Sequence, residues 1–240
     1  MRDGNKVVVI NGGGRGIGRE IAKSLAKENA TVIICSRTKN ELKSVRDEIV
    51  SNGGVCEYFV VDVTKKTQVE NFIKSVATSY GKIDVLINNA GWCHKEKPVE
   101  EITDYDYEKC IETNVHSVFY FMRKVVPIMK EKNSGMIINI SSGAGRTGRH
   151  ALSIYSASKF ALHGLAESVS KELQNTNISC ITLVLMGGFN TKLRGEIFGE
   201  ADAQKQKDPK IVADVVKDIF LDKLKVPNGK YLIVPDRNIV

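Results

Sequence analysis

Residues 6–18 have the sequence KVVVINGGGRGIG, in which an apolar, mostly β-branched run is followed by five glycines in seven positions. The run is typical of a strand buried on both faces, and Ile17, Ile21 and Leu25 then recur at helical spacing. A strand, a glycine turn and a helix indicate a dinucleotide site, because glycines let the backbone approach a pyrophosphate and the helix N-terminus presents free N–H groups. The spacing Gly-x-x-x-Gly-x-Gly differs from Gly-x-Gly-x-x-Gly, and a purely structural turn would also explain some of the glycines.

The second expected strand indicates which dinucleotide binds. About twenty residues beyond the glycines, a site for NAD places an acidic residue on the ribose hydroxyls. Here Ser36 and Arg37 stand at that place, and an arginine attracts a 2′-phosphate. Arg15, inside the glycine turn, could reach the same phosphate, whereas the nearest carboxylate, Glu41, falls on the next helix. Unless Arg37 is only a solvated charge at a strand end, the sequence predicts NADP(H) in preference to NAD(H).

Apolar strands and amphipathic helices alternate along the 240 residues, of which 42% are hydrophobic. This alternation predicts an α/β fold: a Rossmann-like, doubly wound parallel sheet of about seven strands with helices on both faces, in three layers. The length suits one substantial core, so we expect a single NAD(P)-binding domain over residues 1–240. The expected strands lie near 6–11, 31–36, 56–61, 84–88, 136–140, 178–184 and 230–234. The expected helices lie near 16–29, 39–52, 65–80, 105–131, 153–175 and 209–224.

The composition argues against several other classes of protein. The net charge is +7, but the lysines are spread over the expected helices and form no basic run of a nucleic-acid-binding module. The positive excess would attract an anionic cofactor or substrate. No apolar stretch reaches the roughly 18 residues that cross a bilayer, and residues 1–5 do not resemble a signal peptide, so we expect a cytoplasmic protein without membrane contact. The five scattered cysteines are expected to be buried thiols, and the four histidines lack metal-ligand spacing, so we expect no metal.

A phenol and an ammonium group stand four positions apart in the segment Tyr155-Ser-Ala-Ser-Lys159. On a helix both side chains leave the same face, about one turn apart. At roughly 5 Å and an effective dielectric of about 20, their attraction favours the phenolate by about 3 kcal/mol. This would lower the pKa of the phenol by roughly two from its reference value of about 10, towards the range that a general acid/base needs. A packed tyrosine beside a solvated lysine would give the same short pattern, so the pair needs support from the rest of the chain.

That support comes from motifs that together resemble the short-chain dehydrogenase/reductase family in its compact single-domain form, similar to its 3-oxoacyl-thioester (acyl-carrier-protein) reductases. The resemblance covers essentially the whole chain, and the motifs follow the family's order and spacing. The matching positions are Asn11, Gly12, Gly16, Ile17 and Gly18 in the cofactor loop, Asp62-Val63 after the third strand, Asn88-Asn89-Ala90-Gly91 after the fourth, Asn114, Ile140-Ser141-Ser142, and Tyr155 with Lys159. The family's serine usually lies thirteen residues before the tyrosine, which selects Ser142 over Ser141.

The resemblance implies an oxidoreductase that moves a hydride between nicotinamide and a carbonyl carbon. Tyr155 would exchange the proton of the carbonyl oxygen, and Ser142 would hydrogen-bond the developing oxyanion. Lys159 would lower the pKa of the phenol and bind the nicotinamide ribose, and Asn114 would hold a water that links Lys159 to solvent. Asp62 would bind the adenine amino group. Structural roles, such as a turn at Ser142 or a helix kink at Asn114, are the alternative.

Two departures from the family pattern affect the cofactor site. The family usually has threonine where this chain has Asn11, whose side chain can still hydrogen-bond across the strands. After the sixth strand, Gly187 and Thr191 match the family's nicotinamide turn, but Met186 replaces its usual proline. Proline fixes φ, whereas adjacent glycines loosen a turn, so we expect weaker cofactor binding or a less ordered turn, which Met186→Pro would reverse.

The resemblance leaves the substrate open. Residues 189–210 are polar and lie where the family has a substrate lid, although a plain surface excursion would have the same composition. The substrate pocket is expected to be lined by Trp92, Cys93 and His94 and by the segments 143–153 and 189–198. Arg146, Arg149 and His150 would favour an anionic substrate, or would face solvent or a neighbouring subunit. A 3-oxoacyl thioester is the first expectation, with sugar alcohols, steroids and small xenobiotic ketones as alternatives.

Two further expectations concern the class of function and the assembly. A catalytically silent NADP(H)-binding regulator or scaffold with the same fold is the alternative to an enzyme, although all four catalytic positions are filled. An extended-type epimerase or dehydratase would need a larger C-terminal domain. The family implies a homo-oligomer, a tetramer or a dimer, whose interfaces would use the helices near 105–131 and 153–175 and the last strand.

Overall fold

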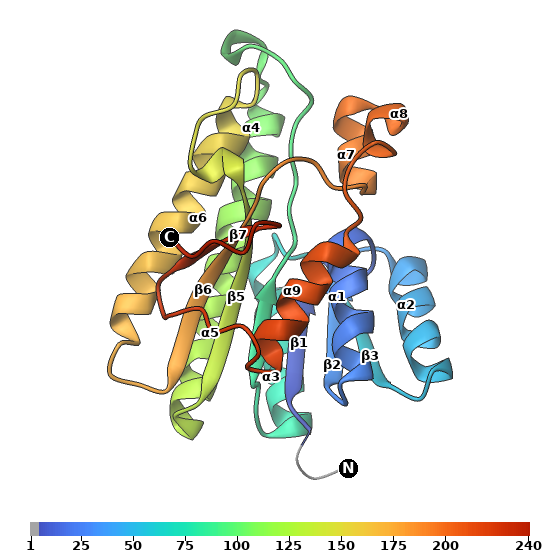
Figure 1. The fold of residues 1–240 in the computed structure, drawn as a ribbon, viewed down its shortest axis with the longest axis vertical. Helices are drawn as coiled ribbons and strands as arrows, with labels where there is room; N and C mark the ends of the chain where they lie inside the picture. Colours follow the sequence, from blue (N-terminus) through green and yellow to red (C-terminus); the bar gives the residue numbers. More distant parts are fainter. Residues whose placement is uncertain (1–4) are drawn as a thin grey trace.

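The computed structural model describes residues 5–240, which form one parallel sheet flanked by helices (Figure 1). The strands are β1 (Val7–Asn11), β2 (Thr31–Ser36), β3 (Val55–Val60), β4 (Val85–Asn88), β5 (Gly135–Ser142), β6 (Ile178–Leu185) and β7 (Tyr231–Val234). The helices are α1 (Gly16–Lys27), α2 (Lys39–Ser51), α3 (Lys66–Tyr80), α4 (Asp104–Ile111), α5 (Ser117–Lys132), α6 (Ser153–Glu172), α7 (Lys192–Phe198), α8 (Glu200–Ala203) and α9 (Lys210–Phe220). The strand order β3-β2-β1-β4-β5-β6-β7 confirms the Rossmann-like, doubly wound sheet.

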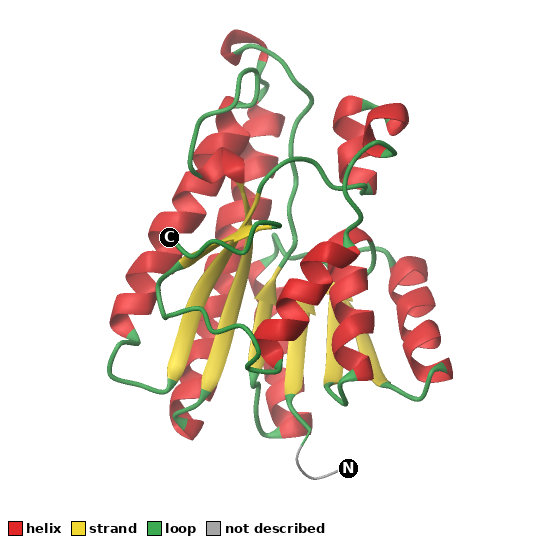
Figure 2. Cartoon of the chain, viewed as in Figure 1, coloured by secondary structure: helices red, strands yellow, loops and turns green. Residues whose placement is uncertain are grey.

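Helices cover both faces of the sheet, which gives the expected three layers (Figure 2). Successive residues of a strand point to opposite faces, so β1 places Val8 and Ile10 in one core and Val7 and Val9 in the other. The first core receives apolar residues from α1, α2 and α9, and the second receives them from α3, α5 and α6. The central strands β1 and β4 are buried on both faces and are nearly continuous apolar runs, as the sequence indicates, whereas the edge strand β3 is partly exposed and contains Glu57.

The helix expected over 105–131 is interrupted. A capping box of Thr103 and Asp106 begins α4, and a π-helical turn at Glu112–His116 then separates α4 from α5. No glycine or proline marks a break over residues 104–126, so the sequence pattern alone did not reveal the turn. Two further short helices, α7 and α8, lie inside the segment 189–210, where we expected no helix.

A row of buried asparagine side chains joins the middle strands where they end. Asn11 Nδ2 donates to Asn88 Oδ1 at 2.8 Å, and Asn88 Nδ2 donates to Asn139 Oδ1 at 2.9 Å. Asn139 Nδ2 in turn donates to the backbone oxygen of Ile181 at 3.3 Å. The three asparagines occupy one register row of β1, β4 and β5. A slip of one residue would leave these amides buried without partners, so the row fixes the register of β1, β4 and β5.

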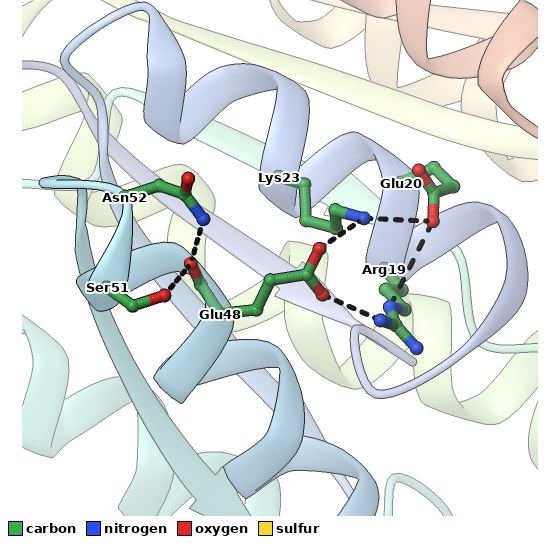
Figure 3. A network of polar contacts seen from close by, with 6 residues as sticks. All are labelled: Arg19, Glu20, Lys23, Glu48, Ser51 and Asn52. Atoms are coloured by element: carbon green, nitrogen blue, oxygen red, sulfur yellow. Dashed lines mark hydrogen bonds and ion pairs between the residues drawn. The ribbon is translucent and has the colours of Figure 1, made fainter.

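A polar network fixes α1 against α2 (Figure 3). Glu48 on α2 accepts from Lys23 Nζ and from Arg19 Nη2, each at 2.6 Å, and both donors lie on α1. The hydrogen bond from Lys23 keeps the pKa of Glu48 below its usual value. Ser51 and Asn52 donate to the backbone oxygen of Glu48 and close the last turn of α2. The network therefore fixes the packing of α1 beside α2.

Two composition-based expectations can be compared with the structure. The five cysteines are buried and free, as expected. Within residues 5–240, no helix has both the length and the apolar character that a bilayer span requires.

Candidate active site

A cavity of about 460 Å³ opens beyond the carboxyl ends of the strands, where the strand order reverses between β1 and β4. Open α/β sheets bind ligands at this switch point. The predicted site residues that line it are Gly12, Arg15, Gly16, Ile17, Ser36, Arg37, Asp62, Val63, Asn89, Ala90, Gly91, Tyr155, Lys159 and Thr191. The other predicted site residues do not line the cavity, although most of them contact residues that do. They are Asn11, Gly18, Asn114, Ser142 and Gly187.

The glycine turn requires glycine for two different reasons. Gly12 has φ +68°, and a Cβ there would lie 2.9 Å from Ala90 Cα. A Cβ on Gly18 would clash with the backbone oxygen of Gly12, so Gly18 lets the first turn of α1 pack against the loop. The turn is therefore closed against β4, while α1 begins at Gly16 with its free N–H groups at the cavity.

Asn11 fulfils the role expected across the strands. Its Oδ1 accepts from the backbone N–H groups of Asn89 and Ala90, at 2.8 and 2.7 Å. Asn89 Nδ2 returns a hydrogen bond to the backbone oxygen of Gly12 at 3.0 Å. The asparagine thus satisfies two amides after β4 and fixes the wall of the cavity formed by residues 89–91.

The end of the cavity near β2 has groups suited to a phosphorylated ribose. Ser36 Oγ is buried and has no hydrogen-bond partner among the described residues. A buried hydroxyl without a partner is costly, and a ligand oxygen would satisfy it. Arg15 and Arg37 line the same end, together with Thr38 and Glu41. This donor set fits an adenosine ribose that carries a 2′-phosphate.

Asp62 follows β3 and is oriented by its neighbours. Its Oδ1 accepts from the backbone N–H and the hydroxyl of Thr64, at 3.0 and 2.8 Å. Burial opposes ionisation of the carboxyl, but these two hydrogen bonds outweigh it and keep the pKa of Asp62 below its usual value. An Asp-x-Thr turn is a recognisable sequence pattern, so Thr64 could have been predicted as a supporting residue.

Tyr155 and Lys159 lie on one face of α6, as their spacing predicts. Lys159 Nζ is 5.8 Å from the centre of the Tyr155 ring and donates to the backbone oxygen of Ile140 at 3.2 Å. The Ser142 hydroxyl, at the end of β5, hydrogen-bonds the Tyr155 phenol. The structure therefore brings the predicted serine, tyrosine and lysine together at the cavity.

The predicted lowering of the phenol pKa is wrong for the groups that the protein itself supplies. Burial raises the pKa of Tyr155 above its ordinary value, and the hydrogen bond from Ser142 offsets only part of the rise. Burial also lowers the pKa of Lys159 to about 8. The Coulomb argument omitted the cost of desolvating a phenolate, which here exceeds the attraction of an amine 5.8 Å from the ring. Burial therefore favours the protonated form of the Tyr155 phenol.

Asn114 lies in the π-helical turn, and its side-chain amide is fully engaged. Its Oδ1 accepts from the Trp92 N–H at 2.9 Å, and its Nδ2 donates to the Trp92 backbone oxygen at 2.8 Å and to Ser158 Oγ at 2.9 Å. These bonds fix the segment after β4 against α6. π-Turns occur often at functional sites because they re-aim a side chain in this way.

In the turn after β6, Met186→Pro would change more than the flexibility of the backbone. The Met186 N–H donates to the backbone oxygen of Val234 at 2.8 Å, and proline would remove that donor. Gly187 has φ +81°, as the matching family glycine suggests, and Lys207 Nζ closes the turn on the Met186 backbone oxygen at 3.0 Å. Whether this turn weakens cofactor binding stays a prediction.

The segment 189–210 is anchored at its base. Phe189 pairs with Lys207, and the Asn190 N–H donates to the Lys207 backbone oxygen at 2.8 Å. Between these anchors, α7 and α8 project over the upper ends of α1 and α2 (Figure 1). Thr191, at the N-terminus of α7, accepts from the Arg194 N–H and packs against Gly16 of the glycine turn.

Only part of the expected substrate pocket lines the cavity. Trp92 and Leu193 line it, whereas Cys93 and His94 are buried behind it and Phe189 is part of the core. Arg146, Arg149 and His150 are exposed and lie outside its lining. Sequence reasoning expected the segment 189–198 at the pocket, but it did not single out Lys192, Leu193 and Glu196 within it, and it did not assign Thr38 or Glu41 to the cavity. No sequence pattern distinguished Lys192, Leu193 and Glu196 from their neighbours, because they reach the cavity only through the fold of the segment 189–210.

A sequence profile described as short chain dehydrogenase matches residues 6–202. The chain belongs to the short-chain dehydrogenase family. It is therefore a member of a family of oxidoreductases, and the match covers the glycine turn, the serine strand and the Tyr155–Lys159 pair.

Curated relatives of this short-chain dehydrogenase include enzymes with named substrates. It is 32% identical over 196 residues to an NADPH-dependent pterin aldehyde reductase of Arabidopsis thaliana, covering 82% of this chain and 80% of the relative. It is 35% identical over 188 residues to a 3beta-hydroxysteroid dehydrogenase of Mediterraneibacter gnavus, covering 78% and 67%.

Solved structures share its fold along nearly its whole length. Levodione reductase superposes with a TM-score of 0.89 at 26% identity and 95% coverage of each chain. An actinorhodin polyketide ketoreductase solved with NADPH superposes with a TM-score of 0.87 at 27% identity, covering 96% of this chain and 95% of its own.

Proposed function

We propose that this short-chain dehydrogenase is an NADP(H)-dependent oxidoreductase that reduces a carbonyl, or oxidises a secondary alcohol, with Tyr155 as general acid/base. One observation carries the proposal: the Tyr155 phenol, hydrogen-bonded by Ser142 and one helical turn from Lys159, opens onto the cavity at the switch point of the sheet. The relatives that are a pterin aldehyde reductase and a polyketide ketoreductase support this reaction type.

The residues present fit the coenzyme. The glycine turn and the start of α1 would hold the pyrophosphate, Asp62 the adenine, and Ser36, Arg15 and Arg37 the phosphorylated ribose. Residues 89–92, which include Trp92, would bind the nicotinamide and its ribose beside Tyr155. When bound, the nicotinamide supplies the hydride or accepts it. The unpartnered Ser36 hydroxyl and the absence of an acidic residue at position 37 favour NADP(H) over NAD(H).

Each catalytic side chain has a role that follows from its contacts. Tyr155 is protonated at neutral pH and gives its proton to the carbonyl oxygen as negative charge develops there. Ser142 donates a hydrogen bond to the same oxygen and orients the phenol. Lys159 holds a positive charge below a pKa of about 8, which stabilises the phenolate left behind. Asn114 positions the Trp92 segment with its side chain, so the water relay predicted for it would use its backbone carbonyl.

A carbonyl screen tests the function. We expect NADPH oxidation, followed at 340 nm, with at least one member of a panel that holds a 3-oxoacyl thioester, a steroid ketone, a pterin aldehyde and small cyclic diones. The 3-oxoacyl thioester is the substrate class we propose first. NADPH should give a higher kcat/KM than NADH by about tenfold or more. Tight NADPH binding without oxidation by any of these compounds would instead support a silent regulator or scaffold, and a clear preference for NADH would contradict the coenzyme assignment.

We propose that the protein is a homo-oligomer, a tetramer or a dimer. Large apolar side chains on α4, α5 and α6 remain exposed: Tyr105, Tyr107, Phe119 and Phe160. Exposed aromatic side chains are enriched at protein interfaces. Sedimentation equilibrium should give a mass at least twice that of the 26.5 kDa chain, and Phe160→Glu should shift it towards the monomer. A wild-type protein that sediments as a monomer at all concentrations would contradict this assembly.

A further inference from the structure

The lid helix α7 reaches the phosphate end of the cleft. Lys192, Leu193 and Glu196 line the same cavity as Ser36 and Arg37. Lys192 and Glu196 are four positions apart, so both leave one face of α7. The packing of Thr191 against Gly16 holds the start of this helix at the glycine turn. The lid thus carries one positive and one negative side chain to the place where the ribose phosphate is expected.

Both lid charges are paired with residues of the phosphate end. Arg15 Nη1 lies 3.4 Å from Glu196 Oε1 and 3.8 Å from Glu41 Oε1. Lys192 Nζ lies 3.6 Å from the same Glu41 oxygen. Glu41 therefore holds Arg15 and Lys192 close together, and Glu196 occupies the guanidinium of Arg15. The side chains of Arg15, Lys192 and Glu196 are 41%, 59% and 46% exposed, so these pairs are weak and easily exchanged.

We propose that Lys192 is a specificity residue for the 2′-phosphate, carried by the lid, and that Glu196 is the carboxylate which the phosphate displaces from Arg15. This inference rests on the proposed NADP(H) function. A phosphate dianion offers Arg15 and Lys192 more charge and more acceptor oxygens than a carboxylate does. It also repels Glu196, so α7 changes position when the coenzyme carries the phosphate. A coenzyme without the phosphate leaves the pairs with Glu196 and Glu41 in place.

This competition for Arg15 would give the lid a second function, recognition of the coenzyme, in addition to covering the substrate. The free energy of binding the 2′-phosphate and the free energy of the Arg15–Glu196 contact are coupled, because the phosphate and the Glu196 carboxylate compete for the same guanidinium. Neutralising Glu196 removes the competitor and should strengthen phosphate binding. Neutralising Lys192 removes a ligand and should weaken it. The two substitutions on one helix therefore have opposite expected effects, which a general loss of lid order would not produce.

The experiment is calorimetric titration of the full chain with two nucleotides. Adenosine 2′,5′-bisphosphate carries the 2′-phosphate, and 5′-AMP lacks it. Lys192→Gln should raise the dissociation constant of the bisphosphate by about twofold to fivefold, and Glu196→Gln should lower it by a similar factor. The dissociation constant of 5′-AMP should be unchanged in both variants. Lys205→Gln removes an exposed positive charge from the same lid and serves as the matched control. Hydrogen exchange in residues 192–203 should change with the bisphosphate and not with 5′-AMP.

The outcomes separate this inference from the proposed function, because binding needs no turnover. If the wild type prefers the bisphosphate but Lys192→Gln behaves like Lys205→Gln, or Glu196→Gln has no effect, only the lid inference is overturned. If the wild type does not distinguish the two nucleotides, the NADP(H) preference fails and the lid inference fails with it. If the nucleotide results are as expected and no carbonyl is reduced, the lid inference stands and the enzymatic proposal fails.

Discussion

Tyr155→Phe is expected to reduce the rate of carbonyl reduction by about 10³-fold and to leave NADPH binding within about twofold of the wild type. The substitution removes one oxygen from a side chain that lines the cavity and is hydrogen-bonded by Ser142. Phenylalanine keeps the ring and its packing, so the loss would be that of the proton donor. Single-turnover absorbance at 340 nm, with NADPH and the best carbonyl from the screen, measures the hydride step directly.

The control for this result is Tyr107→Phe, which removes a phenol that is 51% exposed on α4. It should retain full activity. The pH dependence adds a second readout: since burial keeps the Tyr155 phenol protonated, reduction should proceed at neutral pH, whereas alcohol oxidation, which needs the phenolate, should accelerate as pH rises. A Tyr155→Phe enzyme with more than a tenth of wild-type activity would show that another group donates the proton.

The catalytic pair shows how far sequence reasoning extends. The spacing of Tyr155 and Lys159 correctly predicts one helical face, because helical geometry depends on backbone spacing alone. The direction of the phenol pKa was wrong, because a pKa depends on burial, and burial is decided by residues far away in the chain. The local sequence pattern thus predicts which side chains lie close together, and the tertiary structure determines whether they are charged.

The same division holds for the fold and the rest of the site. The seven strands were predictable because each is an apolar run between turn residues. The π-turn at Asn114 was not, because residues 104–126 contain no glycine or proline that would mark a break in the helix. Glu196 of α7 reaches Arg15 only because Phe189 and Lys207 bring the two ends of the segment 189–210 together, and that contact has no sequence pattern. Lys192 and Glu196 were therefore expected only as part of the pocket wall 189–198, and their place beside Arg15 and Glu41 could not be assigned before the structure.

Lys159→Met is expected to reduce activity by about 10²-fold or more and at the same time to stabilise the protein. The wild-type amine is only 6% exposed, and burial lowers its pKa from 10.5 to about 8. A shift of this size means that the charged amine costs the folded state about 3 kcal/mol at neutral pH. Methionine has a similar length and no charge, so it removes that cost while leaving the phenolate of Tyr155 without its cation. Urea unfolding at pH 7 should show an increase of up to about 3 kcal/mol in the free energy of unfolding.

The sign of the pH dependence distinguishes this explanation from better packing by methionine. Below pH 8 the folded wild type carries the full cost of the charge, and above pH 10.5 the amine is neutral in both folded and unfolded states and the cost is gone. The stability difference between Lys159→Met and the wild type should therefore shrink as pH rises from 8 towards 10.5. Lys171→Met, an exposed lysine of α6 that pairs with Glu167, is the matched control and should be slightly destabilising with normal activity. A gain in stability that stays constant over this pH range would mean that the lysine is not held charged in the site, and the assignment of its electrostatic role would be lost.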